Sequence, residues 1–311
     1  MPCHDGRVTQ STVPREGRIV VLAGPGVFAP EQGAGIIGVR ALAATGSLGV
    51  ANTWGAKGVF GWDSPHHLGT CGLQARDFEL LGWADADAII ATGVDDAETP
   101  RAQFALAPVF DVGPDELGAL AGSVRASGAP LMNELYPRLA AVAQPGFVDD
   151  RVPLHPARAV ADLGAALPPG GVATADPGIA GLWVARTFPT PAVEPGGPRR
   201  VVVPSTGTLG AAGRVAAEAA RAGHPAIIVT TDPVPRETAA IYEELAAEHA
   251  PVVLVVWSEH GSLGRASEHR GLVEAALAVP GASVVEVPVA LSLTGLLIDA
   301  AGPVVAWGGL A

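Results

Sequence analysis

Residues 205–210 read STGTLG and open the most regular part of the chain. A run with helical periodicity follows over 211–222, and the apolar run 226–229 then predicts a buried strand. That strand leads into Thr231-Asp232-Pro233, and a further helix and strand lead into 259–264, which read EHGSLG. Strands that alternate with helices predict a mostly parallel sheet with helices on both faces. The sequence therefore predicts a doubly wound α/β fold.

The first half of the chain shows the same alternation. An apolar strand is expected over 18–23, a helix over 32–45, and a long loop over 54–72, which is rich in glycine, aromatic residues and histidine. Further strands are expected at 50–53, 88–92 and 109–112, and a helix over 78–83. A turn-rich linker is expected over 145–155. We therefore expect a disordered lead-in over 1–17 and two doubly wound domains, 18–150 and 151–311.

Charge and composition exclude several classes of protein. The formal net charge of −12 argues against nucleic-acid binding, which needs clustered Lys and Arg. The cysteines Cys3 and Cys71 have no metal-binding spacing and predict reduced thiols in a cytoplasmic protein. The polar first 17 residues lack the apolar core of a signal peptide. No apolar run approaches the roughly 18 residues of a membrane span.

Both halves resemble parts of thiamin-diphosphate-dependent enzymes. The second half is similar to their diphosphate-binding domain, which has Gly-Asp-Gly at positions 231–233 and Asn-Asn at 259–260. Residues 18–120 resemble the central domain of the acetolactate synthase and pyruvate oxidase branch, through WGAKGVF at 54–60, PHHLG at 65–69 and WADADAIIATG at 83–93. The resemblance implies thiamin diphosphate and Mg²⁺ as cofactors of the second domain. It implies FAD or ADP in the first domain of some members.

The resemblance also implies roles for individual residues, though it gives no catalytic residue to this chain. Asp232 would ligate the metal, with Glu259 and His260 as weaker candidates. Leu209 would support the bent cofactor. The other implied cofactor-binding residues are Asp176, Gly178, Gly207, Thr208 and Gly210 in the second domain, and Gly24, Gly26 and Lys57 in the first.

The second half also departs from the family pattern. Pro233 stands where the family has glycine, and proline offers no N–H to a phosphate; Pro235 removes another donor. A second carboxylate at Glu259 makes the site more anionic, and imidazole is a poor ligand for Mg²⁺. Asp232 could instead cap a helix over 236–249, and positions 259–260 could form an exposed polar turn.

Simpler readings also exist for the first half. Gly24 and Gly26 fit a dinucleotide fingerprint formally, but Pro30 follows at once and no acidic residue closes the next strand. Lys57 could meet a phosphate or be a solvated loop lysine. His66 and His67 could be acid–base groups, but no carboxylate-rich partner lies at ligand spacing, so a packing role is favoured.

Three functions follow from this reading. In the family, a separate pyrimidine domain supplies the activating glutamate, and only 17 residues precede the first expected strand. The first hypothesis is a subunit of a 2-keto acid decarboxylase or carboligase that needs a partner chain carrying this domain. The second is a degenerate, non-catalytic binding or regulatory module. The third is a nucleotide-binding protein that uses its first domain. A homo-oligomer is also expected, because an uncovered apolar face favours association.

Overall fold

The structure is a computed structural model that describes residues 13–309. The chain forms two compact units. The first unit contains residues up to Gly72, Arg76–Leu135 and the short segment Ala192–Gly197, and the second unit contains the remainder, including Leu73–Ala75. The units divide after Leu135, whereas the sequence suggested a boundary near residue 150. Cys3 and residues 1–12 of the expected lead-in lie outside the described residues.

The first unit is built on a five-stranded parallel sheet with the order β4-β3-β2-β5-β6. Its strands are β2 (Ile19–Ala23), β3 (Gly49–Thr53), β4 (His67–Cys71), β5 (Ala88–Thr92) and β6 (Val109–Asp111). Its α-helices are α1 (Ala34–Gly46), α2 (Asp77–Leu80), α3 (Arg101–Phe104) and α4 (Leu117–Leu120). A separate pair of strands joins β1 (Glu16–Gly17) to β7 (Arg125–Ala126).

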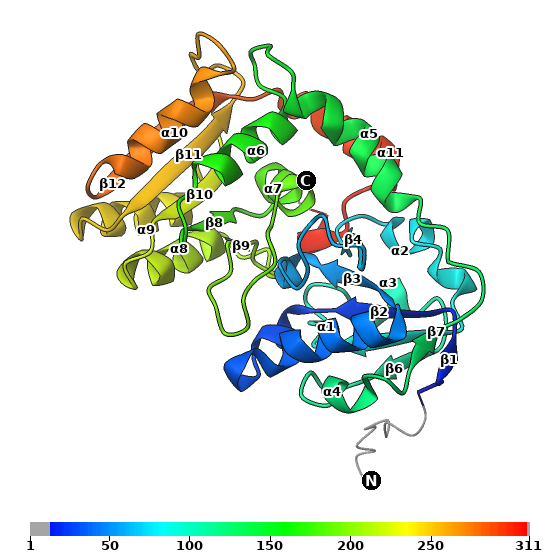
Figure 1. Ribbon diagram of the computed structural model, residues 1–311. Helices are drawn as coiled ribbons and strands as arrows, with labels where there is room; N and C mark the ends of the chain where they lie inside the picture. Colours follow the sequence, from blue (N-terminus) through cyan, green and yellow to red (C-terminus); the bar gives the residue numbers. More distant parts are fainter. Residues whose placement is uncertain (1–12, 310–311) are drawn as a thin grey trace, which may run out of the picture. The chain divides into compact units, whose positions relative to one another are not determined.

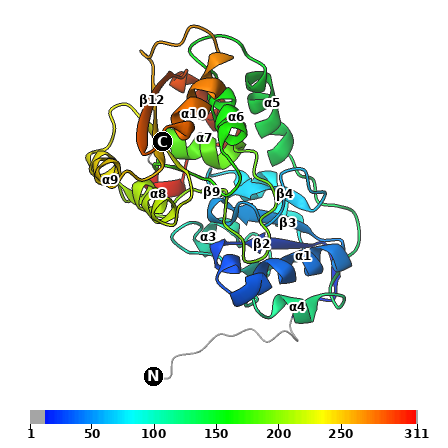
Figure 2. The same ribbon diagram turned by 60° about the vertical axis from the view of Figure 1, so that its left-hand side comes forward.

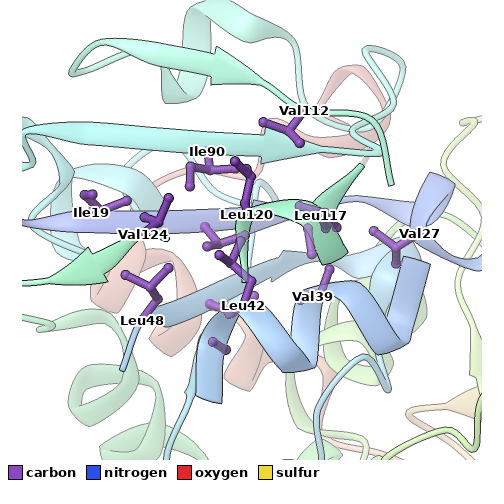
Figure 3. Close-up of a cluster of buried hydrophobic side chains, with 14 of the residues drawn as sticks. Ile19, Val27, Val39, Leu42, Leu48, Ile90, Val112, Leu117, Leu120 and Val124 are labelled. Carbon is purple, nitrogen blue, oxygen red and sulfur yellow. The ribbon is translucent and has the colours of Figure 1, made fainter. Parts of the chain in front are cut away.

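The core of the first unit lies between the sheet and helices α1 and α4. Figure 3 shows Val39 and Leu42 of α1 in this cluster with Leu117 and Leu120 of α4. Alternate residues of β2 and β5, including Ile19 and Ile90, belong to the same cluster. The residues between them on these strands are also buried, which explains why both strands read as continuous apolar runs.

Two expectations for the first unit were wrong. The expected loop 54–72 contains strand β4 at the edge of the sheet, where its register with β3 shifts between Val50 and Ala51. Histidine and glycine in this strand concealed the apolar alternation that predicts strands. The lead-in is not disordered to residue 17, because β1 pairs with β7.

The second unit has its own five-stranded parallel sheet, with the order β12-β11-β10-β8-β9 (Figure 1). The strands are β8 (Val172–Ala175), β9 (Val201–Val202), β10 (Ala226–Thr231), β11 (Val252–Ser258) and β12 (Ala282–Pro288). The helices are α5 (Leu135–Phe147), α6 (Pro156–Ala166), α7 (Ile179–Thr187), α8 (Ala211–Arg221), α9 (Arg236–Ala247), α10 (Glu268–Ala278) and α11 (Thr294–Ala301). Helix α5 runs into the expected linker 145–155 and contains Pro145.

Helices cover both faces of this second sheet, which confirms the doubly wound class. On one face, alanines of α8 and Leu245 of α9 pack against Ile228 and Leu254. Helices α6, α7 and α10 lie on the other face (Figure 2). Buried side chains hold them together: the carboxylate of Asp162 on α6 contacts the Nδ1 atom of His269 on α10 at 3.1 Å.

The strand orders define where each sheet can bind a ligand. In the first unit, the chain runs from β2 to β3 and β4 on one side, and then from β5 to β6 on the other side. The strand order therefore reverses between β2 and β5. In the second unit it reverses between β8 and β10. Open parallel sheets bind ligands at the carboxyl ends of the strands, at such a switch point. Each unit therefore has one switch point at the carboxyl ends of its strands.

Candidate functional sites at the carboxyl ends of the two sheets

The carboxyl edge of the second sheet gathers every residue that the sequence proposed for that half. Asp176 and Gly178 follow β8, the 205–210 loop follows β9, Asp232 follows β10, and Glu259 and His260 follow β11. These strands are parallel, so their carboxyl ends share one edge. The proposed residues are thus brought to the same edge, although their roles stay predictions.

Asp176 is buried at the switch point and joins two other elements. Its carboxylate accepts hydrogen bonds from the hydroxyls of Thr230 on β10, at 2.7 Å, and Thr238 on α9, at 2.9 and 3.0 Å. Burial raises the pKa of the Asp176 carboxyl, while both hydroxyl donors lower it. The sequence did not indicate either threonine. This carboxylate therefore connects β8, β10 and α9 and is already engaged within the fold.

Gly178 and Gly210 occupy positions that favour glycine. Gly178 has a φ of 109° and precedes α7, and Gly210 has a φ of 75° and precedes α8. A Cβ atom on Gly210 would also lie 2.9 Å from the Cβ of Glu237 on α9. Both glycines are thus explained by backbone conformation or packing without a ligand.

The 205–210 loop presents an apolar side chain to solvent. Leu209 is 46% exposed. Gly207 is half-buried, and the Thr208 hydroxyl pairs with that of Thr206 at 2.6 Å. The Leu209 side chain is therefore accessible to a bound cofactor.

Asp232 is exposed at the end of β10, and its N–H donates to the carbonyl of Trp257 at 2.9 Å. This bond places residue 232 directly beside the end of β11. The alternative that Asp232 caps the next helix is wrong, because Pro235 is the N-cap residue of α9 and no side chain caps that helix.

The loop after β11 is an exposed polar turn, as one interpretation of the sequence proposed. Glu259 and His260 are both exposed, and the His260 N–H donates to the Ser258 hydroxyl at 3.3 Å. Among residues 13–309, no group of three or more His, Cys, Asp or Glu side chains is arranged to hold one metal ion. The proposed ligands Asp232, Glu259 and His260 thus do not form such a group by themselves.

Residues 232–235 do not fit a magnesium-bound diphosphate held in the family's manner. A diphosphate needs several N–H donors that face it. Within 232–235, the Asp232 N–H donates to the Trp257 carbonyl, and Pro233 and Pro235 have no N–H to donate. Val234 alone in this stretch has an N–H that a phosphate could use.

The carboxyl edge of the first sheet contains an open cleft of about 1220 Å³. The cleft lies at the switch point, with its walls formed by the segments that follow β2, β5 and β6. Its lining comprises Pro25, Gly26, Ala91, Gly93, Val94, Asp95, Asp96, Arg101, Phe104, Asp111, Val112, Gly113, Pro114, Asp115 and Glu116.

Glycines let the backbones after β2 and β5 approach each other beside this cleft. The N–H groups of Gly24 and Gly26 donate to the carbonyls of Thr92 and Gly93 at 2.9 and 2.8 Å. A Cβ atom on Gly24 would lie 2.3 Å from the Gly93 carbonyl oxygen, and one on Gly26 would lie 2.8 Å from the Gly93 Cα. Gly26 lines the cleft as the sequence proposed, whereas Gly24 acts by this close contact.

The charged residues of the cleft lining are mainly acidic. Arg101 is its single Lys or Arg residue, and its guanidinium forms an ion pair with Asp111 at 2.6 Å. Asp95 accepts the Ala97 N–H at 2.9 Å, and Glu116 accepts the Gly113 N–H at 3.0 Å. Carboxylates that keep free acceptor positions can bind hydroxyl or amine groups of a ligand.

Lys57 lies outside the cleft lining and is buried, so a solvated loop lysine is the wrong interpretation. Burial, with the nearby Lys57 charge, lowers the pKa of His67 to about 4, so this imidazole is neutral near pH 7. Its Nε2 atom lies 2.9 Å from the Asn52 amide oxygen, and the Nδ1 atom of His66 lies 3.2 Å from the Leu48 carbonyl. Both histidines thus have packing roles. Cys71 is buried outside any disulfide, and its thiol donates to the Asn52 carbonyl at 3.5 Å.

No helix in the described part of the chain is both long and apolar enough to cross a membrane.

Comparisons with known proteins point to one fold. No protein-family model matches the chain. No curated protein matches it. Among solved structures, an X-ray structure of a proposed thiamin diphosphate-dependent enzyme from Mycobacterium smegmatis superposes with a TM-score of 0.64 at 15% sequence identity. The match covers 88% of this chain and spans 61% of the length of the other. The chain thus has a fold also found in that enzyme structure.

Proposed function

We propose that this chain is a small-molecule-binding protein with the fold of a thiamin-diphosphate enzyme, and that its ligand site is the cleft of the first unit. The cleft of about 1220 Å³ at the switch point carries this proposal. The best-supported ligand class is an adenine nucleoside, because the carboxylates of the lining disfavour the negative charge of a phosphate. This function combines the non-catalytic module and the nucleotide-binding alternative considered above.

Three features support a nucleoside in this cleft. The backbone of Gly26 and Gly93 lets a ligand approach the strand ends closely. The carboxylates of Asp95, Asp96 and Asp115 can accept hydrogen bonds from ribose hydroxyls, as an acidic residue does in other doubly wound nucleotide-binding folds. Half-buried Val94 and Pro114 provide an apolar surface beside them for a base, whereas Phe104 is itself buried. The resemblance to enzymes that hold FAD or ADP in their central domain adds to this.

Calorimetric titration of the purified protein with adenosine, ADP and FAD tests the proposal. We expect saturable heat with at least one of these ligands, and its loss in Val94→Trp, which places an indole among the lining residues of the cleft. Leu106→Trp is the matched control, because Leu106 is 42% exposed in the same unit and does not line the cleft. If wild type shows no heat with all three ligands, or Val94→Trp binds as wild type does, the proposal fails.

The second candidate function is a subunit of a split thiamin-diphosphate enzyme. Two observations favour it: Asp232 lies beside the end of β11, and Leu209 is exposed on the same edge. A partner polypeptide would then supply the pyrimidine domain and the activating glutamate, with sites formed in an oligomer. The reaction class would be decarboxylation or carboligation of a 2-keto acid.

The test of this candidate is turnover of a 2-keto acid by the chain mixed with a partner polypeptide that carries a pyrimidine domain, with thiamin diphosphate and Mg²⁺ added. Activity that disappears in Asp232→Ala would establish it. Heat on titrating the isolated chain with both cofactors would establish its cofactor half alone. Sedimentation analysis would report the expected oligomer.

A further inference from the structure

We infer that the carboxyl edge of the second unit does not bind a magnesium-bound diphosphate, and that residues 233, 259 and 260 are chiefly responsible. The edge retains the architecture of such a site. Its strands are parallel, and Asp232 lies at the end of β10 beside the end of β11, where a carboxylate could ligate a metal. The inference is independent of the nucleoside proposal, which concerns the other unit, and it argues against the split-enzyme candidate, which binding of magnesium pyrophosphate by wild type would favour instead.

The first step concerns hydrogen-bond donors. A free phosphate oxygen in a loop of this kind is stabilised chiefly by backbone N–H groups at a helix start. Helix α9 begins directly after Pro233-Val234-Pro235, so two of the three residues before it have no N–H. The preceding N–H, that of Asp232, donates to Trp257. A phosphate placed against this loop would exchange several water hydrogen bonds for few protein ones.

The second step concerns charge. Glu237 lies in the first turn of α9, and Asp232 and Glu259 are exposed at the ends of β10 and β11. A carboxylate at a helix N-terminus uses the favourable dipole that would otherwise attract an anion. Arg214 and Arg236 are exposed cations in the first turns of α8 and α9, and their positive charges partly offset the negative charge of these carboxylates. They bring no fixed N–H groups to the strand ends.

The third step concerns the metal. Mg²⁺ needs close octahedral oxygen coordination and usually binds one or two carboxylates together with phosphate oxygens. His260 offers nitrogen, which Mg²⁺ disfavours. Glu259 places a second negative charge where the diphosphate would approach. An amide at either position would offer oxygen without that charge.

The experiment restores the missing groups. The variant Thr231→Gly, Pro233→Gly, Glu259→Asn, His260→Asn is titrated with inorganic pyrophosphate and Mg²⁺, and wild type is titrated in parallel. Pyrophosphate is used because it tests the diphosphate half of the site without any pyrimidine domain. We expect no measurable heat from wild type and an affinity at least tenfold higher in the restored variant. Addition of Asp232→Ala to the restored variant should abolish that gain.

Two results would overturn the inference. Wild type could bind pyrophosphate with Mg²⁺, or bind it without Mg²⁺ through its arginines. Alternatively, a folded restored variant could bind no better than wild type, which would show that other residues control the edge. Circular dichroism checks the fold, and the double variant Thr231→Gly, Pro233→Gly replaces the fourfold variant if the latter unfolds. Adenosine titration of every variant reports separately on the first unit.

Discussion

The two units have the same arrangement of parallel strand ends at their switch points, but different groups lie there. In the first unit, backbone meets backbone at the switch point: Gly24 and Gly26 lie against Gly93, and an open cleft remains beside them. In the second unit, a buried side chain lies at the switch point: Asp176 is hydrogen-bonded to Thr230 and Thr238. The glycines of the first unit lie beside an open cleft, whereas the buried carboxylate of the second unit is engaged within the fold.

This difference teaches that a shared fold does not imply a shared site. Both sheets satisfy the topological condition for ligand binding. Only the chemistry of the strand ends distinguishes them, and that chemistry is set by a few residues in each unit. The comparison can be broken or sharpened by changing those residues.

The largest effect is expected from Gly24→Ala. The added Cβ would lie 2.3 Å from both the Gly93 carbonyl oxygen and the Val94 Cα, and neither backbone atom can move aside freely. We expect a loss of about 3 kcal/mol in the free energy of unfolding, measured by chemical denaturation. Gly24 has a φ of −103°, so the cost arises from space and not from backbone conformation.

Gly118→Ala is the matched control in the same unit. A Cβ there meets nothing within 4 Å, and Gly118 lies in helix α4. Because alanine favours helices over glycine, we expect a gain of about 0.5–1 kcal/mol. Equal effects of both substitutions would show that the close contact does not hold the edge together.

The next largest effect is expected from Asp176→Ala in the second unit. It removes the acceptor of both threonine hydroxyls in a buried place. Leaving such groups without an acceptor costs about 1–3 kcal/mol, so we expect a loss of about 2 kcal/mol on chemical unfolding. Asp176→Asn keeps an acceptor oxygen and should cost less. A loss in Asn as large as in Ala would show that the charge, and not the hydrogen bonding, matters.

A smaller effect is expected in the pH dependence of stability, through Asp176 of the second unit. Burial raises the pKa of Asp176 in the folded protein. An acid with a raised folded pKa contributes stability that is present below its unfolded pKa, near about 3.9, and is lost as pH rises through the folded pKa. Wild type should therefore lose stability relative to Asp176→Asn between about pH 4 and the raised value. A constant difference between the two proteins across that range would contradict the prediction.

The sequence predicted much of this comparison but not its outcome. Apolar runs at β2, β5, β10 and β11 indicated parallel strands because both faces of these strands are buried. The edge strand β4 escaped detection, since its histidine and glycine lie at a sheet border where apolar alternation is not required. Local patterns predict where a strand ends, and this placed Asp232 and Glu259 on one edge.

The contacts at each edge depend on residues far apart in sequence, and local patterns do not contain them. Asp176 was proposed as a pocket residue, but its partners Thr230 and Thr238 come from a later strand and helix. The same applies to the cleft of the first unit, whose acidic wall combines loops after β5 and β6. Pro233, by contrast, was informative from sequence alone, because the absence of its N–H needs no partner.

The smallest effect on stability is expected from Arg101→Ala at the first cleft. Its ion pair with Asp111 is about half exposed, with side-chain exposures of 49% and 53%, and such pairs contribute about 0.2–1 kcal/mol, less at high salt. Arg76→Ala is the control, because Arg76 forms a similar exposed pair with Glu79 away from the cleft lining. Both variants should unfold within about 1 kcal/mol of wild type. Only Arg101→Ala removes the single cation among the lining residues, so it alone should weaken ADP several-fold while leaving adenosine unchanged. If both variants weaken ADP equally, the charge of the cleft does not select its ligand, and the contrast between the edges then rests on shape alone.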